Sequence, residues 1–146
     1  MLSDGDQVRN LLGRYCERID AGDLDGVGAL FAAGRLTTED GDVLASGASE
    51  VAAFYRRGTT LHDGSPRTKH LVTNVVLDVD ETAATAAVRS SYLVLQQVGD
   101  GPLDPIITGH YHDTFECHDG AWRFAERRFF VDLVGDLSEH LAYAIG

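Results

Sequence analysis

Apolar residues recur at three- and four-residue steps in the first part of the chain, as in an amphipathic helix. This apolar stripe consists of Val8, Leu11, Leu12, Tyr15, Cys16 and Ile19. It predicts a helix over residues 6–21, because Gly22 suits the left-handed geometry of a helix end. Asp23 can then cap a second helix with apolar residues at positions 24, 27, 30 and 31. The chain is therefore predicted to open with a helical hairpin.

The pattern then changes to short segments. Residues 35–39 and 43–44 are predicted to be two strands joined by a tight turn at residues 40–41. Helical spacing returns over residues 49–58, which predicts a third helix.

Long strand-like segments fill most of the second half of the chain. Four strands are predicted, over residues 71–77, 83–98, 106–117 and 121–131. Turn-forming residues separate consecutive strands, as in an antiparallel meander. A short final helix is predicted over residues 136–145, with Leu137, Leu141 and Ala144 on one side.

Helices followed by a meander define an α+β order. We expect one domain over residues 1–146, in which a curved antiparallel β-sheet wraps the N-terminal helices. Such a cone-shaped α+β barrel has a central pocket.

Composition limits the possible partners. The formal net charge of -11 at pH 7 repels phosphates and anionic headgroups, so we expect neither nucleic acid nor a membrane as a partner. The first residues lack the basic and apolar regions of a signal peptide, which favours the cytoplasm. Cys16 and Cys117 are predicted to be reduced core residues.

Asp20 continues the apolar stripe of the first helix although it is a carboxylate. It also stands at the helix C-terminus, where the macrodipole disfavours negative charge. The ordinary explanation is a solvated acid at a frayed helix end. The alternative is a functional carboxylate, since Asp23 is better placed to cap the next helix.

His70 opens the first long strand and shares a face with Val72 and Asn74. An imidazole takes and returns a proton near neutral pH, and a carboxylate on its other nitrogen would raise its basicity. A structural strand histidine is the alternative.

Two imidazoles, His110 and His112, share one face of the third long strand with Glu116. The spacing His-x-His-x3-Glu is used by cupin-type metal sites, because imidazole and carboxylate suit first-row metals. An all-β cupin would not open with helices, which argues against a cupin-type metal site in this chain. A metal-dependent enzyme remains the third alternative.

Aromatic residues dominate the last strand, namely Trp122, Phe124, Phe129 and Phe130. With both faces of the sheet apolar, one face is expected to line the pocket and the other to be covered by a second copy of the chain. Ordinary core packing of these aromatic residues is the alternative.

Four segments of the chain carry a resemblance to a known family. They are residues 15–25 (YCERIDAGDLD), 67–70 (RTKH), 109–112 (GHYH) and 119–124 (DGAWRF). Together they resemble the SnoaL-like branch of the nuclear-transport-factor-type superfamily, nearest to scytalone dehydratase and bile-acid 7α-dehydratase. That superfamily includes several enzyme classes and members without a catalytic role, so the resemblance indicates the fold more strongly than the reaction.

The resemblance implies a catalytic set. Asp20 would hold His70, His70 would remove an α-proton, and His110 would contact a departing hydroxyl. Scytalone dehydratase has a tyrosine directly before the aspartate, whereas this chain has Ile19. Bile-acid dehydratases have a tyrosine five residues before it, which matches Tyr15 and makes Tyr15 the candidate donor to a substrate carbonyl.

The resulting expectation is a cofactor-independent lyase (dehydratase) or isomerase. It would act by acid–base catalysis on a hydrophobic cyclic ketone or polyketide-like molecule. The candidate substrate-binding residues are Tyr55, Tyr92, His112 and Phe54. The alternative is a non-catalytic cone that binds a small ligand or partner, which an Asp20–His70 separation well beyond about 3.5 Å would favour.

Overall fold

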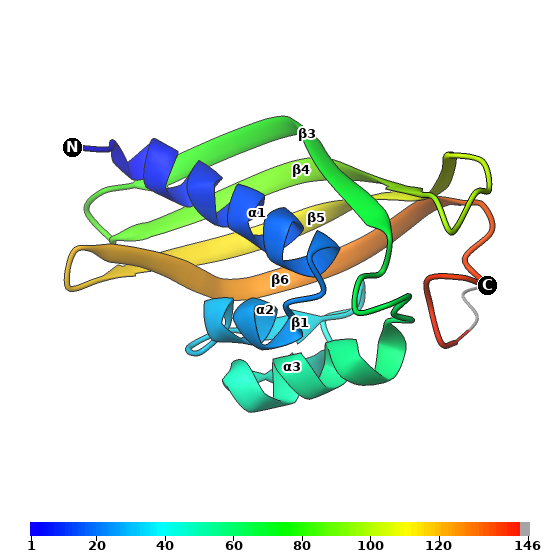
Figure 1. The fold of residues 1–146 in the computed structure, drawn as a ribbon. Helices are drawn as coiled ribbons and strands as arrows, with labels where there is room; N and C mark the ends of the chain where they lie inside the picture. Colours follow the sequence, from blue (N-terminus) through cyan, green and yellow to red (C-terminus); the bar gives the residue numbers. More distant parts are fainter. Residues whose placement is uncertain (144–146) are drawn as a thin grey trace.

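The computed structural model describes residues 1–143, in which three helices and two short strands precede four long strands (Figure 1). The helices are α1 (Asp4–Asp20), α2 (Leu24–Leu30) and α3 (Gly47–Gly58). The strands are β1 (Arg35–Thr37), β2 (Val43–Ser46), β3 (Thr68–Asp80), β4 (Thr85–Gln96), β5 (Asp104–His118) and β6 (Ala121–Val134). The element order matches the predicted one up to residue 134.

The six strands form one sheet in the order β2-β1-β6-β5-β4-β3. Strands β3 to β6 make the predicted antiparallel meander, whereas β1 pairs in parallel with β6. Register shifts interrupt the ladders of β3–β4, β4–β5 and β5–β6, and such bulges bend a sheet. The predicted α+β class with a curved sheet is confirmed, but the sheet does not close into a barrel because β2 and β3 are its edges.

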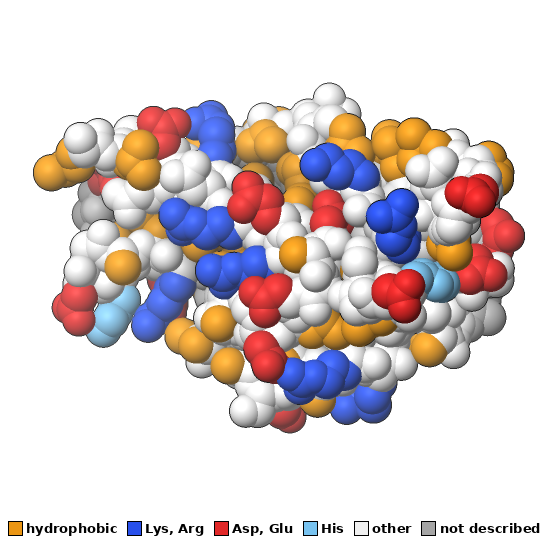
Figure 2. Space-filling view, viewed as in Figure 1, with side chains coloured by type: hydrophobic (Ala, Val, Ile, Leu, Met, Phe, Trp, Pro, Cys, Tyr) orange, Lys and Arg blue, Asp and Glu red, His pale blue; other side chains and the backbone are white. Residues whose placement is uncertain are grey.

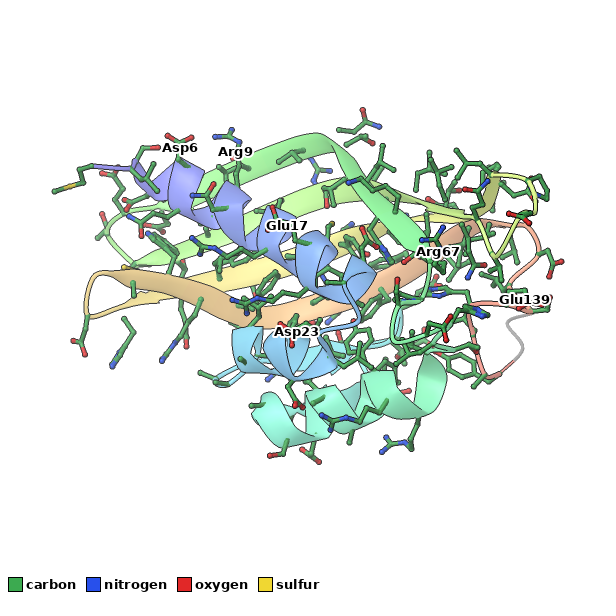
Figure 3. The ribbon with its side chains drawn as sticks, in the orientation of Figure 1. Asp6, Arg9, Glu17, Asp23, Arg67 and Glu139 are labelled. Carbon is green, nitrogen blue, oxygen red and sulfur yellow. The ribbon has the colours of Figure 1, made fainter. Side chains whose placement is uncertain are left out.

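Helix α1 lies across one face of the sheet, which we call the inner face, and α2 and α3 pack against each other beside it (Figure 1). Ser3 caps α1 by accepting a hydrogen bond from the backbone of Asp6. The predicted apolar stripe is buried except for Cys16, which is half-buried, whereas Asp6, Arg9 and Glu17 lie on the exposed side of α1 (Figure 3). The side chain of Asp23 caps α2 as predicted.

The core lies between the inner face and the helices. Its completely buried members include Val8, Val27, Phe31, Leu36 and Phe124. Cys16 and Cys117 are free thiols packed against this core. On the face shown in Figure 2, Lys and Arg side chains are interspersed with Asp and Glu. Within residues 1–143, no helix is long and apolar enough to cross a membrane.

The predicted final helix is wrong where the structure describes it. After one turn at residues 138–140, Leu141 forms an isolated β-bridge with Thr59. The Thr60 N–H donates to the His140 carbonyl at 2.8 Å, and the Ala142 N–H donates to the Gly58 carbonyl at 3.0 Å. These bonds to the end of α3 take backbone groups that a helix would need. Residues 144–146, including Ala144, lie outside the described residues.

Candidate active site

A cavity of about 190 Å³ lies between the inner face of the sheet, α1, α3 and the C-terminal segment. Its wall is mainly aromatic and aliphatic, and the residues lining it include Tyr15, Phe54, Tyr55, Tyr92, Tyr111 and Phe129. Five of the residues predicted for the site therefore reach the pocket, namely Tyr15, Phe54, Tyr55, His70 and Tyr92. The histidines in its wall are His70 and His140.

Asp20 and His70 form a close pair at this wall. Asp20 Oδ1 lies 2.6 Å from His70 Nδ1, and the two side chains are only 16% and 8% exposed. The His70 backbone N–H donates to Asp20 Oδ2, and the Thr68 hydroxyl donates to Oδ1, each at 2.9 Å. The end of α1 and the start of β3 thus hold the carboxylate against the imidazole. With Nδ1 on the carboxylate, Nε2 is the nitrogen left for a ligand.

Electrostatics keeps the Asp20 carboxylate ionised. Burial by itself would raise the pKa of Asp20, but the hydrogen bonds and charge of His70, together with Thr68, outweigh burial and lower this pKa. An ionised carboxylate only accepts hydrogen bonds, so in the neutral form of His70 the proton is on Nδ1, toward Asp20, and the lone pair is on Nε2. This is the arrangement of a general base with its orienting carboxylate.

Tyr15 and Tyr55 meet through their hydroxyl groups deep in the pocket, where they share a hydrogen bond. Burial raises the pKa of both hydroxyls, so both stay protonated at neutral pH. One shared hydrogen bond uses only one of the two protons, which leaves the other for a ligand oxygen.

A buried ion pair behind the pocket wall was not predicted from the sequence. Arg127 donates to both carboxylate oxygens of Asp113 at 2.9 Å, and both side chains are 0% exposed. Its guanidinium carbon lies 3.6 Å from the ring centroid of Tyr111 and 4.2 Å from that of Tyr15. Arg127 thus fixes the two tyrosine rings from behind.

His140 is a second residue that sequence reasoning missed. It lies in the C-terminal segment, is 7% exposed, and its ring centroid is 6.1 Å from that of His70. Burial, followed by the nearby His70, lowers the pKa of His140 to about 4. No signal in the sequence connects position 140 with position 70.

His110 and His112 lie on the outer face of the sheet, away from the pocket. The Tyr111 side chain points inward, so the side chains before and after it point outward. His110 Nδ1 lies 3.0 Å from both carboxylate oxygens of Asp132, and its ring stacks on Phe130. The structure therefore does not bring these two predicted site residues to Asp20 and His70.

The metal alternative has no geometric support. Within residues 1–143, no three His, Cys, Asp or Glu side chains are grouped closely enough to hold a metal ion. Glu116 instead forms a 2.9 Å ion pair with Arg123. His110 and Glu116 belong to the same strand, where six residues span about 20 Å, too far for shared ligation.

Comparisons with known proteins agree with this architecture. A family model for the SnoaL-like domain matches residues 1–128. Among curated proteins, none matches the chain significantly. A solved structure of the protein Rv3472 from Mycobacterium tuberculosis, described as of unknown function, is 27% identical with a TM-score of 0.70. The match covers 88% of this chain and 71% of that protein.

Two proteins from Novosphingobium aromaticivorans are also similar in structure. One, described as NTF2-like with a cystatin-like fold, is 20% identical with a TM-score of 0.70, over 88% of this chain and 81% of the other. The second, provisionally named a scytalone dehydratase, is 19% identical with a TM-score of 0.71. The match covers 98% of this chain and 89% of that protein. At these identities the likeness concerns the fold. The chain thus has an NTF2-like fold and belongs to the SnoaL-like domain family.

Proposed function

We propose that this protein is a lyase or isomerase that removes a proton next to the carbonyl of a hydrophobic cyclic ketone. The observation that carries the proposal is the 2.6 Å contact between Asp20 and His70 at the wall of an apolar pocket. A non-catalytic cone has no need to hold a carboxylate on an imidazole. The 2.6 Å between Asp20 and His70 is also well short of the roughly 3.5 Å beyond which the non-catalytic alternative would be favoured. The provisional name of the 19% identical relative points to the same chemistry.

His70 acts as the base in this proposal. Its Nε2 takes the α-proton, and the electron pair of the broken C–H bond forms the C=C bond of an enolate. Asp20 keeps the Nδ1 proton in place and stabilises the imidazolium that forms. The free hydroxyl proton of the Tyr15–Tyr55 pair donates to the enolate oxygen, where negative charge develops. These steps need no cofactor.

The pocket wall indicates the class of substrate. Its aromatic side chains favour a flat, apolar molecule of fused rings, with one carbonyl directed to Tyr15 and Tyr55. Isomerisation returns the proton to another carbon of the substrate, whereas dehydration expels a β-hydroxyl.

Hydrogen–deuterium exchange tests the proposal without the natural substrate. We expect the protein to accelerate loss of the α-proton NMR signals of 1-tetralone, or of a related ketone, in D2O. Replacing the base by His70→Gln should slow this exchange by about 10²–10⁴-fold. Asp20→Asn should also slow it, since the Nδ1 proton is then no longer held by an anion.

The matched control is His118→Gln. His118 also lies beside a carboxylate, 3.3 Å from Asp119, but its side chain is 63% exposed. We expect exchange in this variant to equal that of the unchanged protein. The proposal is wrong if no ketone of the panel exchanges faster with protein, or if His70→Gln exchanges at the original rate.

We further propose that a second copy of the chain covers the outer face of the sheet. Partly exposed Leu71, Leu93 and Phe130 lie there with His110 and His112, and an apolar strip of this kind is typical of a contact surface. Light scattering at micromolar concentration should give the mass of a dimer. Phe130→Glu places a charge in the strip and should give a monomer with unchanged circular dichroism. A monomeric unchanged protein would refute this arrangement.

A further inference from the structure

The C-terminal strap, residues 136–143, is fixed against the rest of the molecule on both sides of His140. Before it, the Glu139 carbonyl accepts from His62 Nε2 at 2.8 Å and from Gln96 Nε2 at 3.0 Å. After it, the Ala142 N–H donates to the Gly58 carbonyl at 3.0 Å. The backbone of His140 itself accepts from Thr60. The strap therefore holds the His140 ring in one place in the pocket wall.

The His140 ring has hydrogen-bonding capacity that the protein does not use. Among residues 1–143, its buried Nδ1 has no hydrogen-bond partner. Buried polar atoms in native structures are nearly always paired, and because this one is not, the protein itself does not fix which nitrogen of this ring carries the proton. The lowered pKa keeps this imidazole neutral at neutral pH, with one N–H donor and one acceptor.

We propose that His140 is a second catalytic residue, which hydrogen-bonds the hydroxyl oxygen expelled from a β-hydroxy ketone while His70 removes the α-proton. This inference rests on the proposed function and selects dehydration as its reaction. The two rings are 6.1 Å apart and both line the pocket. The α-hydrogen and the β-oxygen of such a ketone sit on adjacent carbons, so one substrate can place the first at His70 and the second at His140.

The elimination passes through an enolate and releases water. His70 Nε2 takes the α-proton and the C–H electron pair forms the enolate. When the carbonyl re-forms, the enolate electron pair becomes the C=C bond between the α- and β-carbons, and the C–O bond breaks with its electrons going to oxygen. The His140 N–H donates a hydrogen bond to this oxygen as its charge grows. The oxygen then receives the proton from the His70 imidazolium and leaves as water. His140 stays neutral throughout, and a neutral imidazole suits a donor that must not lose its proton.

Two probes separate the roles of the two histidines. 1-Tetralone can only exchange its α-protons, whereas 3-hydroxy-1-tetralone can also lose water and give fluorescent 1-naphthol. We expect His140→Phe to slow naphthol formation about 100-fold, the effect of removing one donor to developing charge. Exchange of 1-tetralone should fall at least tenfold less than naphthol formation does, because proton removal does not use the His140 donor.

Further variants and outcomes make the test decisive. His140→Gln keeps an N–H donor and should recover most of the naphthol formation lost in His140→Phe, and His140→Leu replaces the Phe variant should that one not fold. The inference is overturned if the apolar variant forms naphthol at the original rate, or if it loses exchange and elimination equally. If the unchanged protein exchanges the α-protons of neither ketone, the proposed function itself is wrong. That result differs from both outcomes that overturn the His140 inference alone.

Discussion

Two carboxylates near the pocket are each paired with a nitrogen-containing side chain, one at the pocket wall and one behind it. Asp20 holds His70 with both side chains slightly exposed, whereas Asp113 holds Arg127 with both side chains at 0% exposure. A guanidinium keeps its charge at every ordinary pH, but an imidazole exchanges a proton near neutrality. Only the pair with a titratable base beside open space can do proton chemistry. The sealed pair instead supports the rings that the ligand would touch.

The largest effect should come from breaking the sealed pair. Arg127→Met leaves the Asp113 carboxylate buried without a partner, and we expect a loss of about 3–5 kcal/mol in the free energy of unfolding. Burial already raises the pKa of Asp113 in spite of Arg127, so loss of Arg127 should raise this pKa further. Urea denaturation, monitored by circular dichroism, measures the change in the free energy of unfolding.

The control removes both charges at once. The double variant Asp113→Leu/Arg127→Met has no unpaired charge and should be much more stable than Arg127→Met alone. If the single variant is as stable as the unchanged protein, then the pair does not support the pocket.

A smaller effect is expected at the open pair. Asp20→Asn should lower the free energy of unfolding by about 1–2 kcal/mol at neutral pH, since a hydrogen-bonded charge is lost. The pKa of Asp20 is lowered in the folded protein, so its contribution is complete above its unfolded pKa and disappears as the pH falls through the folded value. The stabilities of the two proteins should therefore converge on acidification toward pH 2. Parallel stability curves over this range would contradict the lowered pKa.

The smallest effect is expected at a third pair, His110–Asp132, which is exposed on the outer face with side chains at 36% and 47%. His110→Gln should change the free energy of unfolding by less than about 0.5 kcal/mol, because solvent screens such pairs. It should also leave ketone exchange unchanged, since the ring lies outside the pocket. A large loss of exchange would restore the catalytic role that the family resemblance implied for His110.

Sequence patterns predicted the elements that bury one continuous face. The apolar stripe of α1 led to Asp20, and the long alternating segments led to β3–β6 and to His70. Both predictions use periodicity, which depends on neighbours in the chain.

The residues that were missed lie where this periodicity is interrupted. Trp122 and Phe124 point inward, but a register shift between Thr114 and Phe115 places an extra residue in β6, so that Arg127 points inward where strict alternation expects position 126. His140 was missed because hydrogen bonds to α3 and β4 set the conformation of its segment, in place of the helix that its sequence pattern predicts. The family resemblance placed His110 in the site. On β5, however, Tyr111 points into the pocket, so the adjacent His110 points to the outer face.

The sealed position of Asp113 and Arg127 also restricts how this chain can diverge over time. Neither side chain can be exchanged alone without stranding a charge among aromatic rings. Descendants that lose the aspartate should therefore also lack the arginine, and an inventory of natural variants should show these two positions changing together.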